Sequence, residues 1–390
     1  MPRPRDELSQ DELQRYHRHI ILPHVGEDGQ KKLRNARVLL VGAGGLGSPV
    51  ALYLAAAGVG HIGIVDADVV EISNLQRQVV HDTKSVGKPK AESARTRLLA
   101  LNPLVDVTAH ASRLSAANAL ALIGDYDIVV DGSDNFPTRY LVSDACVLLN
   151  KPNVYGSVLR FDGQASVFTG TTGPCYRCVF PEPPAPGTVP NCESAGVLGV
   201  LPGLIGCIQA TEALKIILGT GDTLEGRLLL VNALRMEFKP ITIERNPECP
   251  SCGTREITAL IDYDEFCGIP KPAMEYGIDD MDDIAWDEIT PRGLQKELEN
   301  GTGVALIDVR EPYEWAIGRI PQARLVPLNA LPAAVASLDR SANTIVYCHH
   351  GTRSAAAVAW LQDQGFSRVR NLVGGINRWS LDVDSTVKRY

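Results

Sequence analysis

Residues 36–47 read ARVLLVGAGGLG, a short apolar run that leads into a segment with four glycines. The run 36–41 is typical of a buried strand, and the small residues 48–57 after the glycines favour a helix. Glycines between a strand and a helix let the backbone approach a phosphate, and the helix N-terminus attracts an anion. This stretch therefore predicts an α/β fold with a nucleotide site at the end of its first strand.

The sequence around this stretch continues the alternation of strands and helices. We expect strands at 62–66 and 127–131, each ending in an acidic residue, with a helix at 90–101 between them. Alternation of this length predicts parallel βαβ units. A further apolar run at 165–168 is expected to continue the sheet, and the polar segment 5–35 is expected to be helical.

The chain changes character at 262–288, which carries ten acidic residues and one lysine. Like charges repel and the apolar content is low, so this segment is typical of a linker. After it a new pattern begins, with strands expected at 304–309 and 344–347 and a helix at 353–364. The sequence therefore predicts a large α/β domain at 1–260, an acidic linker at 261–285 and a smaller α/β domain at 286–390.

Composition narrows the class of protein. The chain has 390 residues, of which 45% are hydrophobic and 22% are charged, as expected for two or three globular domains. The net charge of −8 argues against a general nucleic-acid binder. The charged N-terminus lacks the apolar core of a signal peptide, and the apolar stretch 51–65 is too short to span a membrane. We therefore expect a cytoplasmic protein that acts on neither nucleic acids nor membranes.

The glycine segment alone leaves two kinds of enzyme open. Asp66 ends the second strand, where a carboxylate suits a ribose hydroxyl, and this would serve an NAD-dependent dehydrogenase equally well. Arg77, Lys90 and Asp134 favour a triphosphate site, because cations neutralise phosphates and a carboxylate can hold Mg²⁺. The alternative for Arg77 or Lys90 taken singly is a solvated surface residue.

Further motifs carry a resemblance to a known family. They are RYHRHIILP at 15–23, VGAGGLGS at 41–48, IVDADVVEISNLQRQ at 64–78, VGKPKAES at 86–93, DGSDNFPTRY at 131–140 and PCYRCVFPE at 174–182. With these motifs, residues 8–258 resemble the MoeB/ThiF family, the bacterial relatives of ubiquitin-activating enzymes. The resemblance implies a Rossmann-like adenylation domain that uses ATP to adenylate the C-terminal glycine of a small ubiquitin-like protein.

The resemblance also implies roles for individual residues. Asp134 would hold Mg²⁺, and Arg18 would reach into the site of a partner subunit, which implies a homodimer. The implied ATP contacts are Gly45, Asp66, Ser73, Asn74, Leu75, Gln76, Arg77, Lys90, Asp134 and Asn135.

Four of the nine cysteines form two C-x-x-C pairs, Cys175 with Cys178 and Cys249 with Cys252. Four thiolates bind Zn²⁺ tetrahedrally, and two short turns can each supply two ligands. A site with four ligands and no open position would be structural. The alternative is a set of free thiols. The MoeB/ThiF resemblance also implies zinc at these positions.

A further cysteine, Cys192, follows the proline-rich stretch 181–190. Its thiol could attack an acyl-adenylate or resolve a disulfide, and its position matches one that the family associates with a covalent link to the carrier. The alternative is an inert loop cysteine. We assign Cys146, Cys207 and Cys267 to core or linker positions.

The smaller domain contains a second reactive motif, CHHGTRS at 348–354, between an expected strand and helix. A loop around Cys348 can direct backbone N–H groups and a helix N-terminus at the sulfur, which stabilises a thiolate or persulfide, and Arg353 adds a cation. With LIDVRE at 306–311, GRIP at 318–321 and GGINRW at 374–379, this region resembles the rhodanese family. The four residues between Cys348 and Arg353 form a smaller loop than the five of related phosphatases, and suit sulfur. We expect His349 and His350 to be solvated.

Three functions from different classes remain open at this point. The first is an adenylyltransferase and sulfurtransferase that activates a sulfur carrier ending in Gly-Gly, similar to MoaD, ThiS or CysO, and supplies sulfur from a Cys348 persulfide. The second is a dehydrogenase with an accessory domain, and the third is a binding scaffold without catalysis. We favour the first. The sequence leaves open whether the carrier serves molybdenum cofactor, thiamine or cysteine synthesis or tRNA thiolation, and whether thiosulfate or a cysteine desulfurase supplies the sulfur.

Overall fold

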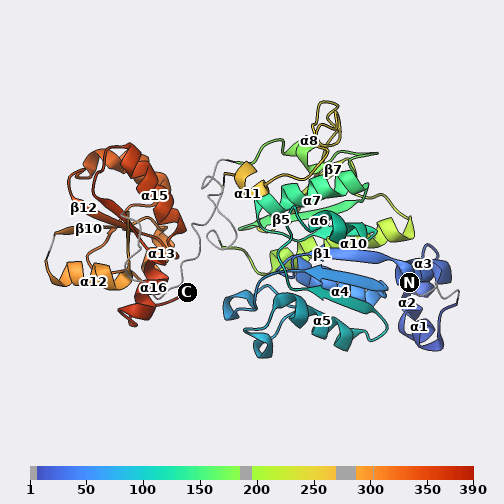
Figure 1. Ribbon diagram of the computed structural model, residues 1–390. Helices are drawn as coiled ribbons and strands as arrows, with labels where there is room; N and C mark the ends of the chain where they lie inside the picture. The colour runs from blue at the N-terminus through green and yellow to red at the C-terminus, as the bar shows by residue number, and fades with distance from the viewer. Residues whose placement is uncertain (1–6, 185–195, 269–286, 302) are drawn as a thin grey trace. The chain divides into compact units, whose positions relative to one another are not determined.

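The computed structural model describes residues 7–184, 196–268, 287–301 and 303–390. The chain divides into two compact units, Met1–Lys271 and Pro272–Tyr390. Each unit has its own sheet and its own hydrophobic core, so each is described by itself (Figure 1).

The first unit is built on an eight-stranded sheet of order β3-β2-β1-β4-β5-β6-β7-β8. Strands β1 to β5 pair in parallel, as expected, whereas β5 to β8 pair antiparallel. The change follows from the connection between β5 and β6, because two residues allow only a hairpin and a parallel crossover needs many more. The strands are β1 (Arg37–Val41), β2 (His61–Val65), β3 (Asp106–His110), β4 (Ile128–Asp131), β5 (Asn153–Leu159), β6 (Asp162–Phe168), β7 (Arg227–Asn232) and β8 (Glu237–Thr242).

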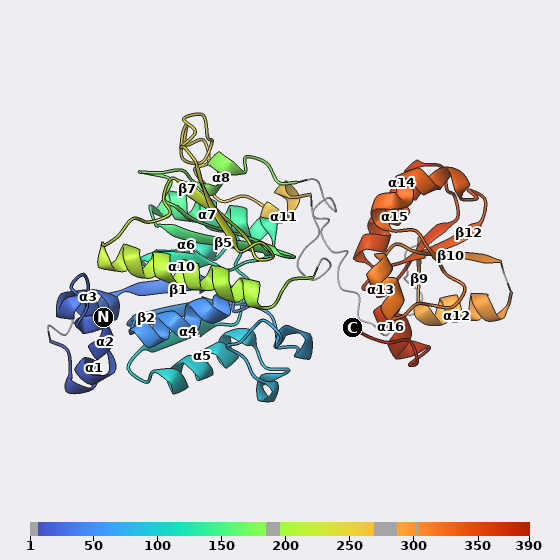
Figure 2. The same ribbon diagram turned by 180° about the vertical axis from the view of Figure 1, so that it is seen from behind.

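Helices cover both faces of this sheet. Along β1 the buried side chains alternate: Val38 and Leu40 belong to one hydrophobic cluster, and Leu39 and Val41 belong to another. The first cluster includes α4 (Gly47–Ala57), α5 (Lys90–Leu101) and α10 (Val200–Leu218), and the second includes α6 (Ala119–Gly124) and α7 (Phe136–Leu149). Figures 1 and 2 show these two helical layers from opposite sides.

The expected helical segment 5–35 is three helices: α1 (Gln10–Arg15), α2 (His17–Ile20) and α3 (Gly26–Asn35). The expectation of helix in this segment is confirmed, and two physical reasons divide it into three. Tyr16 leaves the helical conformation where its buried side chain accepts a hydrogen bond from Asn102. Pro23 disfavours helical backbone at the residue before it, so α2 cannot run into α3.

Helix α10 is long and apolar enough to pass a test for a membrane span by length and composition. It nevertheless lies against α4, β5 and β6. Buried Gln209 donates from Nε2 to the main-chain oxygens of Asp131 and Val154, at 2.7 and 3.0 Å. These contacts make α10 a core helix of the first unit.

The first unit extends beyond residue 260, where the sequence suggested a boundary. Helix α11 (Tyr263–Phe266) contacts α7, and Tyr263 and Cys267 are buried. The start of the segment expected as a linker therefore belongs to the first unit. The remainder of that segment, 269–286, lies outside the described residues.

The second unit has a five-stranded parallel sheet of order β11-β10-β12-β13-β9. Ile307 and Val346 pack with α15 on one face, and Leu306 and Ile345 pack with α12 and α16 on the other. Its elements are β9 (Glu288–Ile289), α12 (Pro291–Glu299), β10 (Val304–Asp308), α13 (Pro312–Ile317), β11 (Arg324–Leu325), α14 (Leu331–Ala334), β12 (Asn343–Tyr347), α15 (Thr352–Asp363), β13 (Val369–Leu372) and α16 (Gly375–Asp382).

Candidate active sites and metal centre

The glycine segment forms a tight turn between β1 and α4. A Cβ atom added to Gly47 would lie 2.0 Å from the Gly42 carbonyl oxygen, so only glycine fits there. Gly42 takes a φ of +93°, and a Cβ on it would lie 3.1 Å from the Gly132 carbonyl oxygen at the end of β4. Glycine at these positions therefore lets the turn pack closely on the backbone at the ends of β1 and β4.

The turn is held at Ala43 from both sides. Its N–H donates to Asp66 Oδ2 at 2.8 Å, and its carbonyl oxygen lies 2.9 Å from His81 Nε2. His81 Nδ1 lies 2.9 Å from Ser93 Oγ on α5. Burial raises the pKa of Asp66 and lowers the pKa of His81, which favours the neutral imidazole. Sequence reasoning found Asp66 but missed His81, because its role depends on contacts with two separate segments.

The predicted cations differ in their surroundings. Lys90 is buried, and its Nζ donates to Asp68 Oδ2 at 2.8 Å, so the alternative of a solvated surface lysine is wrong. Arg77 is half-buried and donates from Nη1 to the Ser73 carbonyl oxygen at 3.3 Å. A Cβ on Gly45 would lie 3.5 Å from Arg77 Cγ, so the structure brings this arginine next to the glycine turn.

Several of the implied ATP contacts already have structural partners. Buried Asn74 accepts the Glu71 N–H through Oδ1, and Asn135 Oδ1 accepts the Thr138 N–H as the N-cap of α7. The Ser73 hydroxyl donates to Glu71 at 3.3 Å. Of the other implied residues, Leu75 is half-buried, and Gln76 and Asp134 are exposed. Arg18, which lies on α2, is also exposed.

A buried polar group adjoins Asp134 and was missed as a site. Asp131 accepts the Ser133 N–H through Oδ1, whereas its Oδ2 has no hydrogen-bond partner among the described residues. Burial raises the pKa of Asp131. Arg139 is buried beside it and donates to the Ser133 carbonyl oxygen at 3.3 Å. The available signal was the position of Asp131 at the carboxyl end of a parallel strand.

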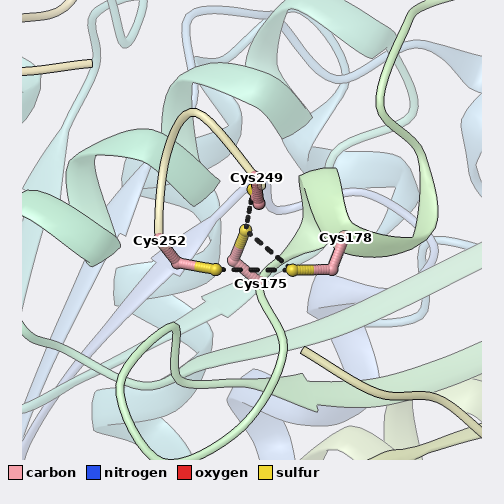
Figure 3. A group of neighbouring side chains, drawn as sticks. All are labelled: Cys175, Cys178, Cys249 and Cys252. Carbon is pink, nitrogen blue, oxygen red and sulfur yellow. Dashed lines mark hydrogen bonds between the residues drawn. The ribbon is translucent and has the colours of Figure 1, made fainter. Parts of the chain in front are cut away.

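The structure brings the four predicted metal ligands together (Figure 3). All four Sγ atoms of Cys175, Cys178, Cys249 and Cys252 lie within 4.8 Å of one another. Three of the separations are 3.4, 3.5 and 3.8 Å. Four sulfurs bound to zinc at about 2.3 Å would be about 3.8 Å apart, so the donor set fits a tetrahedral metal ion. This clustering favours a metal site over the alternative of a set of free thiols.

Further contacts tie this cysteine cluster to the first unit. The Asn246 N–H donates to Cys178 Sγ at 3.4 Å. Arg177, between the first two cysteines, is buried and donates from Nε and Nη2 to the Asp144 carboxylate on α7, at 2.9 Å each. Tyr263 on α11 donates to the same carboxylate at 2.8 Å. The cluster is thereby linked to α7, the helix whose N-cap is Asn135.

Cys348 lies buried at the end of β12, before the turn into α15. Its Sγ accepts the Gly351 N–H at 3.1 Å and lies 3.4 Å from the Ser354 hydroxyl. Gly351 takes a φ of +99°, which turns the loop around the sulfur. Ser354 Oγ also lies 2.7 Å from Asn371 Oδ1 on β13. Among the described residues, one backbone N–H, that of Gly351, points at the sulfur, where the sequence predicted several. The Ser354 hydroxyl lies near the sulfur as a second possible donor, and this arrangement suits an anionic sulfur.

Arg353, the predicted cation of this loop, is paired with a carboxylate that sequence reasoning missed. Its Nη1 and Nη2 donate to the two oxygens of Glu314 on α13, at 2.7 Å each. The Tyr390 hydroxyl lies 3.0 Å from Glu314 Oε1 and 2.7 Å from Arg310 Nη1. Arg310 is itself fully buried and donates to the Asp308 carboxylate.

The expectation that His349 is solvated was wrong. Its ring stacks on Tyr390 with centroids 4.3 Å apart and an interplanar angle of 6°. Burial lowers the pKa of His349 to about 4, so the imidazole is neutral at physiological pH. Of the remaining cysteines, Cys146 is buried in the core as expected, and Cys207 is half-buried on α10. Cys192 lies outside the described residues.

Comparisons with known proteins agree with both units. The ThiF family matches residues 16–251, and the rhodanese-like domain matches residues 290–382. A Mycobacterium tuberculosis protein named probable adenylyltransferase/sulfurtransferase MoeZ is 48% identical to the chain, covering 99% of it and 97% of that relative. A Thermus thermophilus protein named sulfur carrier protein adenylyltransferase is 56% identical, covering 67% of this chain and 98% of that relative.

Among solved structures, the fold resembles Escherichia coli MccB crystallised with AMPCPP and MccA. The TM-score is 0.56 with 22% sequence identity, and the alignment covers 64% of this chain and 76% of that chain. This likeness supports the α/β fold, and the Mycobacterium tuberculosis relative, which covers 99% of the chain, extends over both units. The chain therefore belongs to the ThiF family, and its rhodanese-like domain places it among the adenylyltransferase/sulfurtransferase enzymes of that family.

Proposed function

We propose that this enzyme uses ATP to adenylate the C-terminal glycine of a small ubiquitin-like sulfur carrier, and then converts that glycine to a thiocarboxylate with sulfur from Cys348. The observation that supports this proposal best is the thiol of Cys348. It is enclosed by the Gly351 N–H and the Ser354 hydroxyl, on a chain whose other unit carries the nucleotide turn. A scaffold without catalysis has no use for that thiol, and Arg77, Lys90 and Asp134 favour a triphosphate site over that of a dehydrogenase.

Adenylation requires two anions, a carboxylate and a triphosphate, to be held together. The turn at Gly42 to Gly47 and the N-terminus of α4 suit the phosphates, and Asp66 suits the ribose. Lys90 and Arg77 would offset the phosphate charge, and the exposed carboxylate of Asp134 would hold Mg²⁺ beside them. The carrier carboxylate attacks the α-phosphorus, pyrophosphate leaves, and the product is an acyl-adenylate, a good electrophile.

The sulfur step needs a persulfide on Cys348. Attack of its terminal sulfur on the acyl-adenylate expels AMP and leaves the carrier joined to Cys348 through an acyl disulfide. A second thiol must then attack the Cys348 sulfur, which releases the thiocarboxylate and leaves a disulfide for an external thiol to reduce. Cys192 is our candidate for this second thiol. Fusion of the two domains raises the local concentration of persulfide near the acyl-adenylate.

The remaining parts of the proposal concern the metal on the four cysteines, the oligomeric state and the sulfur donor. We propose a structural Zn²⁺ on the four cysteines, whose sulfur spacing and all-thiolate donor set suit that ion. We also propose a cytoplasmic homodimer in which Arg18 acts across the subunit interface. The sulfur donor would be thiosulfate or a cysteine desulfurase. Paired thiols of this kind persist in a reducing compartment, which agrees with a cytoplasmic location.

Exchange of labelled pyrophosphate into ATP tests the activation step directly. The full chain with Mg²⁺ should catalyse exchange only when a carrier ending in Gly-Gly is present. The matched control is the same carrier without its last glycine, which should support none. Mass spectrometry of the carrier after addition of a persulfide donor should then show a thiocarboxylate. Carrier-independent exchange, or exchange with the truncated carrier at the full rate, would contradict the proposal.

A further inference from the structure

A chain of polar contacts joins the terminal residue Tyr390 to the loop around Cys348. The Tyr390 hydroxyl accepts a hydrogen bond from Arg310 at 2.7 Å and donates to Glu314 Oε1 at 3.0 Å. Glu314 in turn accepts hydrogen bonds from both terminal nitrogens of Arg353, which lies within the loop. Each link is short, and Glu314 and Arg310 are buried, so these contacts fix one geometry.

The ring of Tyr390 makes a separate contact with the same loop. It stacks on His349, the residue directly after Cys348, with centroids 4.3 Å apart. Although Tyr390 is 42% exposed, its hydroxyl joins two buried charged groups. One residue therefore contacts the loop at its start, through His349, and at its end, through Glu314 and Arg353.

We infer that Tyr390 is a positioning residue for sulfur transfer, holding the Cys348 loop closed around the sulfur through Glu314 and His349. Burial raises the pKa of Tyr390, so its hydroxyl keeps the proton that it donates to Glu314. The inference rests on the proposed function of Cys348, which is to hold the sulfur as a persulfide before its transfer. It assigns no role to Tyr390 in the adenylation unit.

The test compares Tyr390→Phe, which loses only the hydroxyl, with Tyr390→Ala, which also loses the stacked ring. The matched control is Lys388→Ala, an exposed residue of the same segment. The assay is transfer of sulfur from thiosulfate to cyanide by the full chain. Thiosulfate gives one sulfur to the Cys348 thiolate and leaves as sulfite, and cyanide then takes that sulfur as thiocyanate.

We expect Tyr390→Phe to lower kcat about 10-fold with little change in KM, because a positioning contact alters geometry more than binding. Tyr390→Ala should lower kcat further, and Lys388→Ala should stay near wild type. In a Glu314→Ala background, Tyr390→Phe should cause no additional loss, because its hydroxyl acts through that carboxylate. An equal loss of kcat in both backgrounds would overturn the inference that the Tyr390 hydroxyl acts through Glu314.

Hydrogen exchange of the peptide 348–354 gives a readout that does not depend on activity. Tyr390→Phe should speed exchange in this peptide while the unfolding midpoint of the second unit stays within a few degrees of wild type. Unchanged exchange together with unchanged kcat would overturn the inference. If the wild-type chain itself transfers no sulfur, the proposed function of Cys348 fails, and the exchange experiment still decides whether Tyr390 orders the loop.

Discussion

Arg353 and Glu314 form a two-point ion pair at the edge of the Cys348 loop, with both N–O distances at 2.7 Å. The carboxylate is buried and the guanidinium is mostly covered. The charge of Arg353 is thereby balanced within the protein, so its main effect on the loop is to fix its shape. The Gly351 N–H and the Ser354 hydroxyl are the groups that reach the sulfur directly.

This pair should make the second unit sensitive to acid. Burial alone would raise the pKa of Glu314, but hydrogen bonds from Arg353 and from the Glu311 N–H outweigh burial and lower it below 4.5. A lowered carboxyl pKa contributes stability that is present above pH 4.5 and is lost as the pH falls through the folded-state pKa. At pH 7, Glu314→Gln should lower the free energy of unfolding by about 3 kcal/mol, because Arg353 loses its charged partner.

Tryptophan fluorescence measures this effect in the full chain, because all four tryptophans lie after residue 285. Urea unfolding should show a large stability difference between wild type and Glu314→Gln at pH 7, and a smaller one at pH 3.5. The control is Glu299→Gln, at an exposed position at the end of α12. A difference that does not depend on pH would contradict this account of the pair.

Asp134→Ala should abolish adenylation and leave the fold intact. Asp134 is exposed three residues after β4, in the segment where Gly132 approaches the glycine turn, and its loss should remove the proposed Mg²⁺ contact. Loss of one such electrostatic contact should lower pyrophosphate exchange about 100-fold or more. Asp28→Ala, at an exposed position on α3, should exchange at the wild-type rate. Undiminished exchange by the Asp134 variant would refute the assignment.

The cysteine cluster should hold one zinc ion per chain. Metal analysis of Cys249→Ser/Cys252→Ser should show its loss, whereas Cys207→Ser, on α10, should keep it. Because Arg177 ties the cluster to Asp144, we also expect the double variant to unfold at lower temperature and to aggregate. Full zinc retention by the double variant would count against the site.

Arg18 should act in the site of a second subunit. It is exposed on the short helix α2, and arginine carries a permanent charge that can reach a phosphate. Arg18→Ala and Asp134→Ala should each be inactive alone, yet a mixture should regain part of the activity through hybrid dimers. Absence of rescue, with subunit exchange demonstrated by mass spectrometry, would exclude this arrangement.

Strand ends were the most predictable part of these sites. Asp66 and the turn at Gly42 could be found because parallel strands bring their carboxyl ends to one edge of the sheet. The cysteine cluster could be found because paired C-x-x-C spacing encodes the ligand set. In each case the chemistry lies in residues that are close in sequence or at fixed places in a regular fold.

Contacts between distant segments were not predictable. Tyr390 and Glu314 are 76 positions apart, and no motif links them. His81 is close in sequence to Arg77, but its two partners lie on the glycine turn and on α5. The mixed sheet was also missed, because the hairpin between β5 and β6 turns at Arg160, a non-glycine residue at a φ of 56°. Such features depend on tertiary packing, which local patterns do not encode.

Sulfur transfer and adenylation should be separable by Cys348→Ala. Cys348 lies in a unit with its own sheet and core, and the nucleotide turn lies entirely in the other unit. The variant should therefore keep carrier-dependent pyrophosphate exchange at the wild-type rate. It should lose thiosulfate sulfurtransferase activity and thiocarboxylate formation from a persulfide donor, because no other described thiol is enclosed by this loop.

Sulfide at high concentration should bypass the defect, since activation of the carrier does not need Cys348 and the acyl-adenylate accepts any strong sulfur nucleophile. Cys207→Ala, on the first unit, is the matched control and should behave as wild type in each assay. The decisive measurement is thiocarboxylate formation at low donor concentration, followed by mass spectrometry. If Cys348→Ala forms the thiocarboxylate normally under those conditions, sulfur reaches the carrier by another route, and the second unit would serve in binding.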